Sequence, residues 1–182
     1  MILNGCDRET IESCQRGDYD AFRALFDAYR DRVYSIALRY SGDPAAAMDI
    51  AQETFLKVWS SIRDFRGESS FESWLYRIVV NRCLDYRRRS RRWMPFLTEL
   101  LDAVIAPAES ALHKLMRSEV EDGVQRVVAS LPPSHRVIVV LRYTEGLSYD
   151  QIAEVLGCST GTVASRLNRA HKLLERRLSK WR

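Results

Sequence analysis

Apolar residues recur at helical spacing along this chain, and no segment shows the alternation of apolar and polar residues that is typical of a half-buried strand. This periodicity constrains the fold more than any other feature. Hydrophobic residues make up 46% of the chain and charged residues 29%, which is an ordinary balance for a folded protein. The sequence therefore predicts an all-α protein with packed cores.

The first half of the chain contains three amphipathic segments, the first over residues 21–38. Aspartate and serine can cap a helix start, proline suits the first helical position, and glycine suits the stop. The expected signals are Asp18 or Asp20 and Gly42 for the first helix, Asp43 and Pro44 for the second, and Ser70 for the third. The expected inward-facing residues are Phe22, Leu25, Phe26, Tyr29, Val33 and Ala37, then Met48, Ala51, Phe55, Val58, Trp59 and Ile62, then Phe71, Trp74, Leu75, Ile78, Val79 and Arg82. These helices predict one compact bundle.

A second helical module is predicted from about Ser118 onward. Its first helix should stop at Pro132 and Pro133, and Ser134 should cap the next one. The expected inward-facing residues are Val120, Val124, Val127, Val128 and Leu131, then Val137, Ile138, Val140 and Leu141. Between the modules, Pro95 and Pro107 bracket an apolar stretch that suits a short helix but lacks packing partners of its own. We expect two small helical domains, 1–92 and 118–182, joined by a linker over 93–117.

The segment 148–172 is typical of a helix-turn-helix. Ser148 and Gln151 have the spacing of a capping box, and Gly157 tolerates the left-handed backbone of a sharp turn. The small Ala153 allows a second helix, capped by Ser159, to cross closely. The expected inner residues are Ile152, Ala153 and Leu156 on the first helix and Val163, Leu167, Ala170 and Leu174 on the second.

The outer face of that second helix is polar and basic, as a recognition helix in the major groove requires. It carries Thr162, Ser165, Arg166, Arg169 and Lys172. Arginine can bind guanine or phosphate, and serine and threonine suit either target. Any amphipathic helix pair shares part of this pattern, and the motif alone does not distinguish a repressor from an initiation factor.

Positive charge is concentrated in two blocks. Residues 66–92 hold eight arginines against three carboxylates, and residues 160–182 hold seven lysines and arginines against one, although the whole chain carries only +4. Two basic blocks on a mildly acidic body indicate a polyanion contacted at two places. Two solvated helix faces would be the plainer interpretation.

Within the first block, one helical stripe combines an aromatic ring, a cation and an amide. Trp74, Arg77, Asn81 and Arg88 fall within roughly 60° of arc at the helical step of about 100° per residue. Such a stripe suits unstacked bases and phosphates. Trp74 would pack equally well in the core beside Phe71, whereas a buried Asn81 would need hydrogen-bond partners.

Several other classes of protein are disfavoured. The cysteines Cys6, Cys14, Cys83 and Cys158 form no C-x-x-C pair, and no histidine lies at a metal-ligand spacing from them. No nucleophile stands beside a base in any recognisable motif, and no phosphate-binding loop is present. No secretory signal and no apolar run of about 18 residues is visible. We expect a cytoplasmic protein without catalytic residues, metal or cofactor.

Taken together, these motifs resemble bacterial sigma factors of the sigma-70 family, in the small extracytoplasmic-function branch. The resemblance covers nearly the whole chain in order. It rests on Gly17-Asp18, Phe22, Leu25-Phe26, Tyr29, Asp49 to Phe55 and Val58-Trp59, then on Phe65 to Phe71, Trp74 to Ile78 and Asn81, then on Leu131-Pro132, Val139, Leu141 to Tyr143, Gly146 to Tyr149, Ile152-Ala153, Gly161 to Val163, Ser165 to Leu167 and Arg169-Ala170.

The resemblance implies a factor that directs core RNA polymerase to promoters and helps to open the −10 element. The implied polymerase-binding residues are Asp49, Gln52, Glu53, Phe55 and Trp59. The implied −10 residues are Gly67, Ser69, Ser70, Phe71, Trp74, Arg77, Asn81 and Arg88, with Arg82 and the arginines of 87–92 along the strand. The implied −35 residues are Thr162, Ser165, Arg166 and Arg169. Partners would be core RNA polymerase and promoter DNA.

Two departures from the family pattern matter. Ala164 stands where the family often has lysine or arginine, which removes one expected DNA contact. The linker is also more apolar than usual, so either an anti-sigma factor or the protein's own domains would cover residues 96–105.

Three alternatives stay open. A free-standing helix-turn-helix regulator would leave the first module without a role, and an enzyme would need an active site that no motif supplies. A pure protein-interaction module would not account for the basic blocks.

Overall fold

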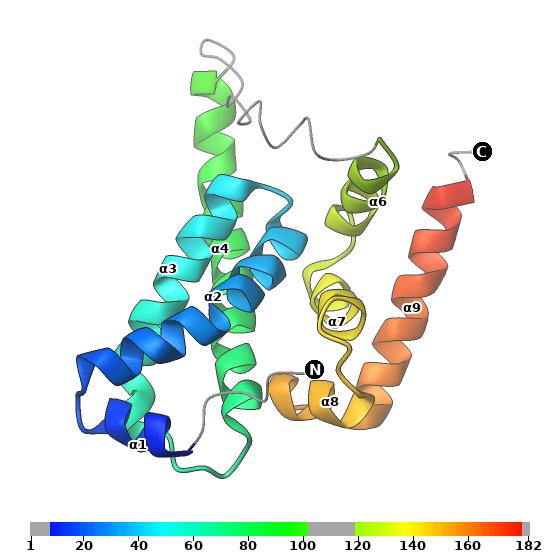
Figure 1. Ribbon diagram of the computed structural model, residues 1–182. Coiled ribbons are helices and arrows are strands. Elements are labelled where there is room, and N and C mark those ends of the chain that lie inside the picture. Colours follow the sequence, from blue (N-terminus) through cyan, green and yellow to red (C-terminus); the bar gives the residue numbers. More distant parts are fainter. Residues whose placement is uncertain (1–7, 102–118, 180–182) are drawn as a thin grey trace.

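The computed structural model describes residues 8–101 and 119–179, with side chains over 8–86 and 123–179. Within these ranges the regular structure is entirely helical, as predicted. Figure 1 shows two groups of helices, with α1 to α4 in one and α6 to α9 in the other. The chain is therefore two small helical domains, joined through a segment that includes 102–118.

The first module is built on α2 (Tyr19–Ser41), α3 (Pro44–Ser61) and α4 (Phe71–Leu101). The Asp18 carboxylate accepts hydrogen bonds from the backbone N–H groups of Asp20 and Ala21, so Asp18 is the cap and Asp20 is not. Gly42 ends α2 at a φ of 79°, and Asp43 caps α3 ahead of Pro44. The predicted signals place both helices correctly.

Helix α4 begins as expected, because the hydroxyl of Ser70 accepts a hydrogen bond from the backbone N–H of Ser73 at 3.1 Å. It does not end with the arginine cluster at Arg92. The helical backbone continues through Pro95 to Leu101 and projects beyond the other helices of Figure 1. The first part of the predicted linker is thus helical, and the rest lies outside the described residues.

The first module also contains a helix that the sequence did not reveal. Helix α1 (Arg8–Gln15) packs on α2 and on the short 3-10 helix η1 (Ile62–Asp64). It buries Cys14, and Ile11 is partly buried beside the core. Two apolar residues in eight give too little periodicity to predict a helix.

The second module contains α6 (Glu119–Ala129), α7 (Pro133–Tyr143), α8 (Tyr149–Leu156) and α9 (Thr160–Leu178). The predicted cap at Ser134 is wrong. Helix α7 already begins at Pro133, and the hydroxyl of Ser134 lies 3.4 Å from Nδ1 of His135 instead. Proline at the first turn replaces the side-chain cap, because it has no N–H to satisfy.

Most of the predicted inner residues with described side chains are buried or partly buried, but three are exposed. Phe26 is 37% exposed, Met48 is 61% exposed and Val124 is 48% exposed. Phe26 and Met48 share the helical stripe of the core residues but lie at its edge, where no helix of the described residues covers them fully. The partly buried ones are Phe22, Trp59, Trp74, Ile78, Arg82, Val128, Leu156 and Leu174.

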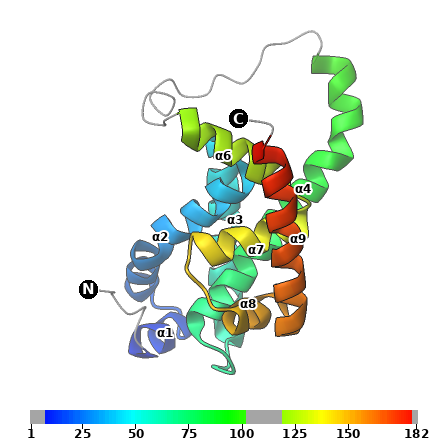
Figure 2. The same cartoon turned by 90° about the vertical axis from the view of Figure 1, so that its right-hand side faces the viewer.

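The two modules pack against each other at two places. The C-terminal end of α2 contacts α6 and α7, and α8 contacts α4. In Figure 2, α7 and α8 lie in front of the first module. This contact was not predicted, because a hydrophobic period shows which face is buried but not against which helix.

Candidate functional site

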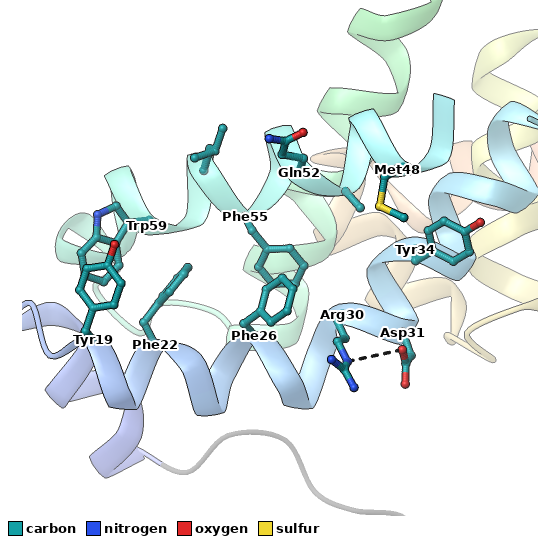
Figure 3. Close-up of a pocket in the computed structure, with 12 residues that line it drawn as sticks. Tyr19, Phe22, Phe26, Arg30, Asp31, Tyr34, Met48, Gln52, Phe55 and Trp59 are labelled. Atoms are coloured by element: carbon teal, nitrogen blue, oxygen red, sulfur yellow. Dashed lines mark ion pairs between the residues drawn. The ribbon is translucent and has the colours of Figure 1, made fainter. Parts of the chain in front are cut away.

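Three surfaces of the molecule carry the residues singled out in the sequence. The first is an apolar groove of about 690 Å³ between α2 and α3 (Figure 3). It is lined by Tyr19, Phe22, Phe26, Arg30, Asp31, Tyr34, Met48, Ala51, Gln52, Phe55, Leu56 and Trp59. Its floor is aromatic: Phe26 meets Phe55 edge-on at 4.6 Å between ring centroids, and Phe22 meets Trp59 at 4.8 Å.

The structure divides the residues expected to bind polymerase into two sets. Gln52, Phe55 and Trp59 line this groove. Asp49 and Glu53 lie on α3 but outside the groove, and the Glu53 carboxylate is 3.9 Å from the guanidinium of Arg82 on α4. Glu53 therefore faces the neighbouring helix.

Tyr19 and Leu56 also line the groove, although neither was predicted from the sequence as a binding residue. Tyr19 is 76% exposed and Leu56 is 63% exposed, although both are large and apolar in character. Leu56 offered a signal, because it lies outside the predicted buried stripe of its helix. An apolar residue at a position that the periodicity assigns to solvent is a candidate for contact with a partner.

The second surface is the loop before α4 and the first turns of that helix. Phe65, Phe71 and Trp74 form a cluster with ring centroids 5.3 to 5.7 Å apart. Gly67 has a φ of 71°, which allows the loop to turn between these rings. The amide of Gln15 on α1 donates to the backbone carbonyls of Ile62 and Phe65 and so braces the loop from outside.

A polar cavity of about 460 Å³ opens beside this cluster. Ser69, Trp74 and Arg77 line it, and Glu154 of the second module contributes to its wall. Trp74 is half-buried, so it serves both as core and as cavity wall. Asn81 is exposed on α4, in agreement with the argument against its burial, and the side chain of Arg88 lies outside the described residues.

The remaining residues of the expected −10 set shape the loop and the start of α4. Phe71 is buried and packs on Tyr29 at 5.5 Å between centroids. Ser70 is the cap of α4, and its hydroxyl also donates to the Ser73 hydroxyl. Gly67 has open space around its Cα.

The third surface is the helix-turn-helix, and it has the predicted geometry. The Ser148 hydroxyl accepts from the Gln151 backbone N–H while the Gln151 side chain accepts from the Ser148 N–H. Gly157 turns the chain at a φ of 60°. Ser159 caps α9, whose buried side carries Val163, Leu167 and Ala170.

The outer side of α9 presents the five predicted DNA-reading residues. Ser165, Arg169 and Lys172 are exposed, and Thr162 and Arg166 are half-buried. Burial first, and then the charges of Arg166 and Arg169, lower the pKa of His135 on α7. The charges of the two arginines thus reach the His135 ring, and within the described residues neither arginine forms an ion pair.

Polar contacts tie the second surface to the second module. The Ser73 hydroxyl donates to the Glu154 carboxylate at 2.9 Å, and Arg77 donates to the Glu154 backbone carbonyl at 2.9 Å. The Tyr76 hydroxyl donates to the Glu145 carboxylate at 3.0 Å. Burial raises the pKa of Glu145, and the Tyr76 hydrogen bond and the Arg32 charge offset this rise only in part.

The described residues contain neither a metal-binding cluster nor a membrane-spanning helix. No group of three or more histidine, cysteine, aspartate or glutamate side chains within them could hold a metal ion. None of the helices in the same ranges combines the length and the apolar character needed to cross a membrane.

Comparison with known families gives two matches along the chain. Residues 25–93 match Sigma-70 region 2, and residues 122–174 match Sigma-70 region 4. The first match contains the α4 surface and most of the groove, and the second contains the helix-turn-helix.

Relatives and solved structures of similar length agree with these matches. The RNA polymerase sigma-H factor of Pseudomonas aeruginosa is 34% identical, over 98% of this chain and 96% of the relative. The ECF RNA polymerase sigma-E factor of Haemophilus influenzae is 34% identical, over 94% of this chain and 95% of the relative. CnrH, solved in complex with the cytosolic domain of CnrY, superposes with a TM-score of 0.71 at 24% identity, over 96% of this chain and 97% of CnrH. It shares the fold.

The partly buried Glu145 carboxyl predicts a specific pH dependence. Because its pKa is raised in the folded chain above the ordinary value of 4.5, Glu145 contributes stability that is fully present below that value and is lost as the pH rises through the folded pKa. Glu145→Gln removes the charge and keeps an acceptor for Tyr76. The free energy of unfolding of this variant, relative to the natural chain, should therefore rise as the pH increases above about 4.5.

Urea unfolding followed by circular dichroism measures this difference at each pH. The exposed Glu175→Gln is the matched control and should show no such trend. A constant difference for Glu145→Gln would contradict the prediction.

Proposed function

Because the chain belongs to the sigma-70 family of RNA polymerase sigma factors, in its extracytoplasmic-function branch, it is a promoter-specific initiation factor, and we propose that three of its surfaces bind core polymerase, the opened −10 strand and the −35 duplex. The observation that carries the proposal is that the groove, the α4 surface and the α9 face lie on different elements. One chain can therefore hold polymerase, an opened strand and a duplex at the same time.

The α2–α3 groove is the surface proposed for core RNA polymerase. It exposes large apolar side chains such as Leu56 and Met48 that no part of the described chain covers, and such patches are typical of protein interfaces. Its apolar floor with Gln52 at the edge suits a helix with an apolar face. Asp49 is exposed on α3 but does not line the groove, so a contact between Asp49 and polymerase would lie outside it.

The α4 surface is proposed to hold the opened −10 strand. Trp74 and the ring cluster behind it offer a rigid platform on which a base can stack. The cavity lined by Ser69 and Arg77 has room for an extruded base. Asn81 lies farther along the exposed side of the helix. Capturing a base costs a few kcal/mol of unstacking, which contacts in the cavity offset. Gly67 gives the loop its turn.

The α9 face is proposed to read the −35 duplex in the major groove. Thr162 at the start of the helix, together with Arg166 and Arg169 one and two turns on, can reach bases and phosphates. Ala164 is half-buried and has no side chain long enough to add a contact there.

An anti-sigma factor is the further partner that we propose. The solved relative RpoE of Bartonella quintana, 24% identical with a TM-score of 0.66 over 87% of this chain and 96% of RpoE, is in complex with the anti-sigma factor NepR. The exposed apolar groove of this chain is the surface that such a partner would cover. The family consists of initiation factors, and we assign no catalytic step to this chain.

Binding to core RNA polymerase is the test that separates this function from that of a free-standing regulator. Purified chain should co-purify with core polymerase and support promoter-dependent transcription. Leu56→Asp should weaken the complex by roughly tenfold or more, because an apolar anchor in an interface contributes about 1.4 kcal/mol or more. The neighbouring Lys57→Asp, a larger change of charge outside the groove, is the control. If Leu56→Asp bound core polymerase as tightly as the natural chain, the assignment of the groove would be wrong.

Arg169→Ala should weaken binding to a promoter duplex. If Arg169 contacts phosphate, the slope of the logarithm of affinity against the logarithm of salt concentration should fall by about one. Fluorescence anisotropy of a labelled −35 duplex over a range of salt concentrations measures both quantities. The exposed Arg23→Ala on α2 should change neither, and an unaltered affinity in Arg169→Ala would count against the α9 contact.

Asn81→Ala should impair promoter opening more than duplex binding, because Asn81 is exposed on the surface proposed for the single strand. Permanganate footprinting with reconstituted polymerase reports opening, and anisotropy reports duplex binding. Normal opening in this variant would refute the role of Asn81. Asn168→Ala, an exposed asparagine on α9, is the matched control for the opening assay.

A further inference from the structure

Helix α1 braces the loop that leads into the α4 surface. Its last residue, Gln15, is half-buried, and the side-chain amide donates to the backbone carbonyl of Ile62 at 3.1 Å and to that of Phe65 at 2.8 Å. The amide nitrogen carries two N–H groups, one for each carbonyl. Figure 1 shows α1 beside this loop. A single side chain therefore fixes the direction in which the backbone leaves η1.

The side chain of Phe65 is held from the opposite direction. Its ring lies 5.3 Å from the Trp74 ring and 5.7 Å from the Phe71 ring, measured between centroids. Phe65 and Trp74 both line the polar cavity beside α4. The backbone of Phe65 is thus fixed by α1, and its side chain is fixed by the aromatic cluster on which a base is proposed to stack.

The four loop residues that follow Phe65 have no comparable support of their own. Residues 66–69 make no backbone-to-backbone hydrogen bond with any other described residue. Three of the four line the cavity, namely Arg66, Glu68 and Ser69. The path of the loop is therefore set at its two ends, by Gln15 at Phe65 and by the cap that Ser70 provides for α4.

We propose that Gln15 is a positioning residue for promoter opening: by holding the start of the loop 66–69, it keeps the cavity beside Trp74 at the width that distinguishes one extruded base from another. This inference rests on the proposed function of the α4 surface. Gln15 does not line the cavity, so it acts through Phe65 and the loop. A binding site is selective when its walls are held to within about 0.5 Å by supporting hydrogen bonds, because a loose wall accepts several bases equally well.

Loss of the amide has a consequence that general destabilisation does not share. When the start of the loop moves, the preference for a particular base at the −10 element should fall. The preference at the −35 element should not change, because α9 belongs to the other module. General destabilisation would lower the amount of active complex and leave both preferences as they are.

Three substitutions separate the hydrogen-bond donor from the shape and the charge of the side chain. Gln15→Leu and Gln15→Glu keep a similar volume and remove the N–H donors. Gln15→Lys keeps N–H donors on a side chain long enough to reach the same carbonyls. Glu9→Leu, at an exposed position on the same helix, is the control for a change on α1 that leaves the loop untouched.

The experiment uses the full chain with core RNA polymerase and two pools of a promoter that the natural chain transcribes. One pool is randomised over the −10 element and the other over the −35 element, and each template carries a transcribed barcode. Sequencing of the transcripts gives the ratio of the most to the least favoured base at each position, and circular dichroism confirms that each variant is folded.

Gln15→Leu and Gln15→Glu should lower the largest ratio at −10 by roughly threefold or more, as expected when one hydrogen bond between the cavity and the base is lost. Both should leave the ratios at −35 unchanged. Gln15→Lys and Glu9→Leu should keep the ratios of the natural chain at both elements, because a charge on α1 attracts all templates equally.

Three results would overturn the inference. In the first, Gln15→Leu and Gln15→Glu keep the full −10 preference. In the second, the preferences at −10 and −35 fall together. In the third, Gln15→Lys loses the −10 preference as Gln15→Leu does, so the donor is not what matters. A natural chain with a −35 preference but no −10 preference would overturn the role of the α4 surface, and this inference with it, whereas the three results above leave that role standing.

Discussion

The packing of the two modules depends on which groups donate hydrogen bonds to the backbone carbonyls at the C-terminal end of α2. The last carbonyls of a helix have no intrahelical donors, and a buried helix end needs partners from elsewhere. Here Arg136 and Gln125 of the second module supply them, and the Arg136 guanidinium lies 5.3 Å from the centroid of the Tyr40 ring. A buried guanidinium needs well-placed hydrogen-bond partners, and the protein loses stability when one of these partners is removed. This favours one relative placement of the modules over a loose association.

From that placement follow the positions of the three surfaces. The groove between α2 and α3 is lined by residues of the first module alone and is open. The α4 surface faces the helix-turn-helix and is partly covered by Glu154. The outer side of α9 keeps its exposed cations. The groove and the outer side of α9 are therefore open, whereas Glu154 covers part of the α4 surface.

Local features of this fold were predictable from the sequence because they depend on neighbouring residues. The caps at Asp18, Asp43 and Ser148 and the turn at Gly157 follow from short-range backbone hydrogen bonding, and all four are present. Long-range features were not predictable. The contact between Ser73 and Glu154 joins residues 81 positions apart, and nothing in the periodicity of either helix identifies the other as its partner. The same limit explains Phe26 and Met48, whose spacing fits a core stripe but whose position is at the open edge of the bundle.

Helix α1 has a consequence for how the first module is delimited. The match to Sigma-70 region 2 begins at residue 25, so α1 and the first turns of α2 lie before it. A fragment cut at that boundary would lose Gln15, which ties the loop at Phe65 in place, and would lose the rings of Tyr19 and Phe22 from the groove. The folding unit of this module therefore starts earlier than its recognisable family signature, and domain dissection should include residues from Arg8 onward.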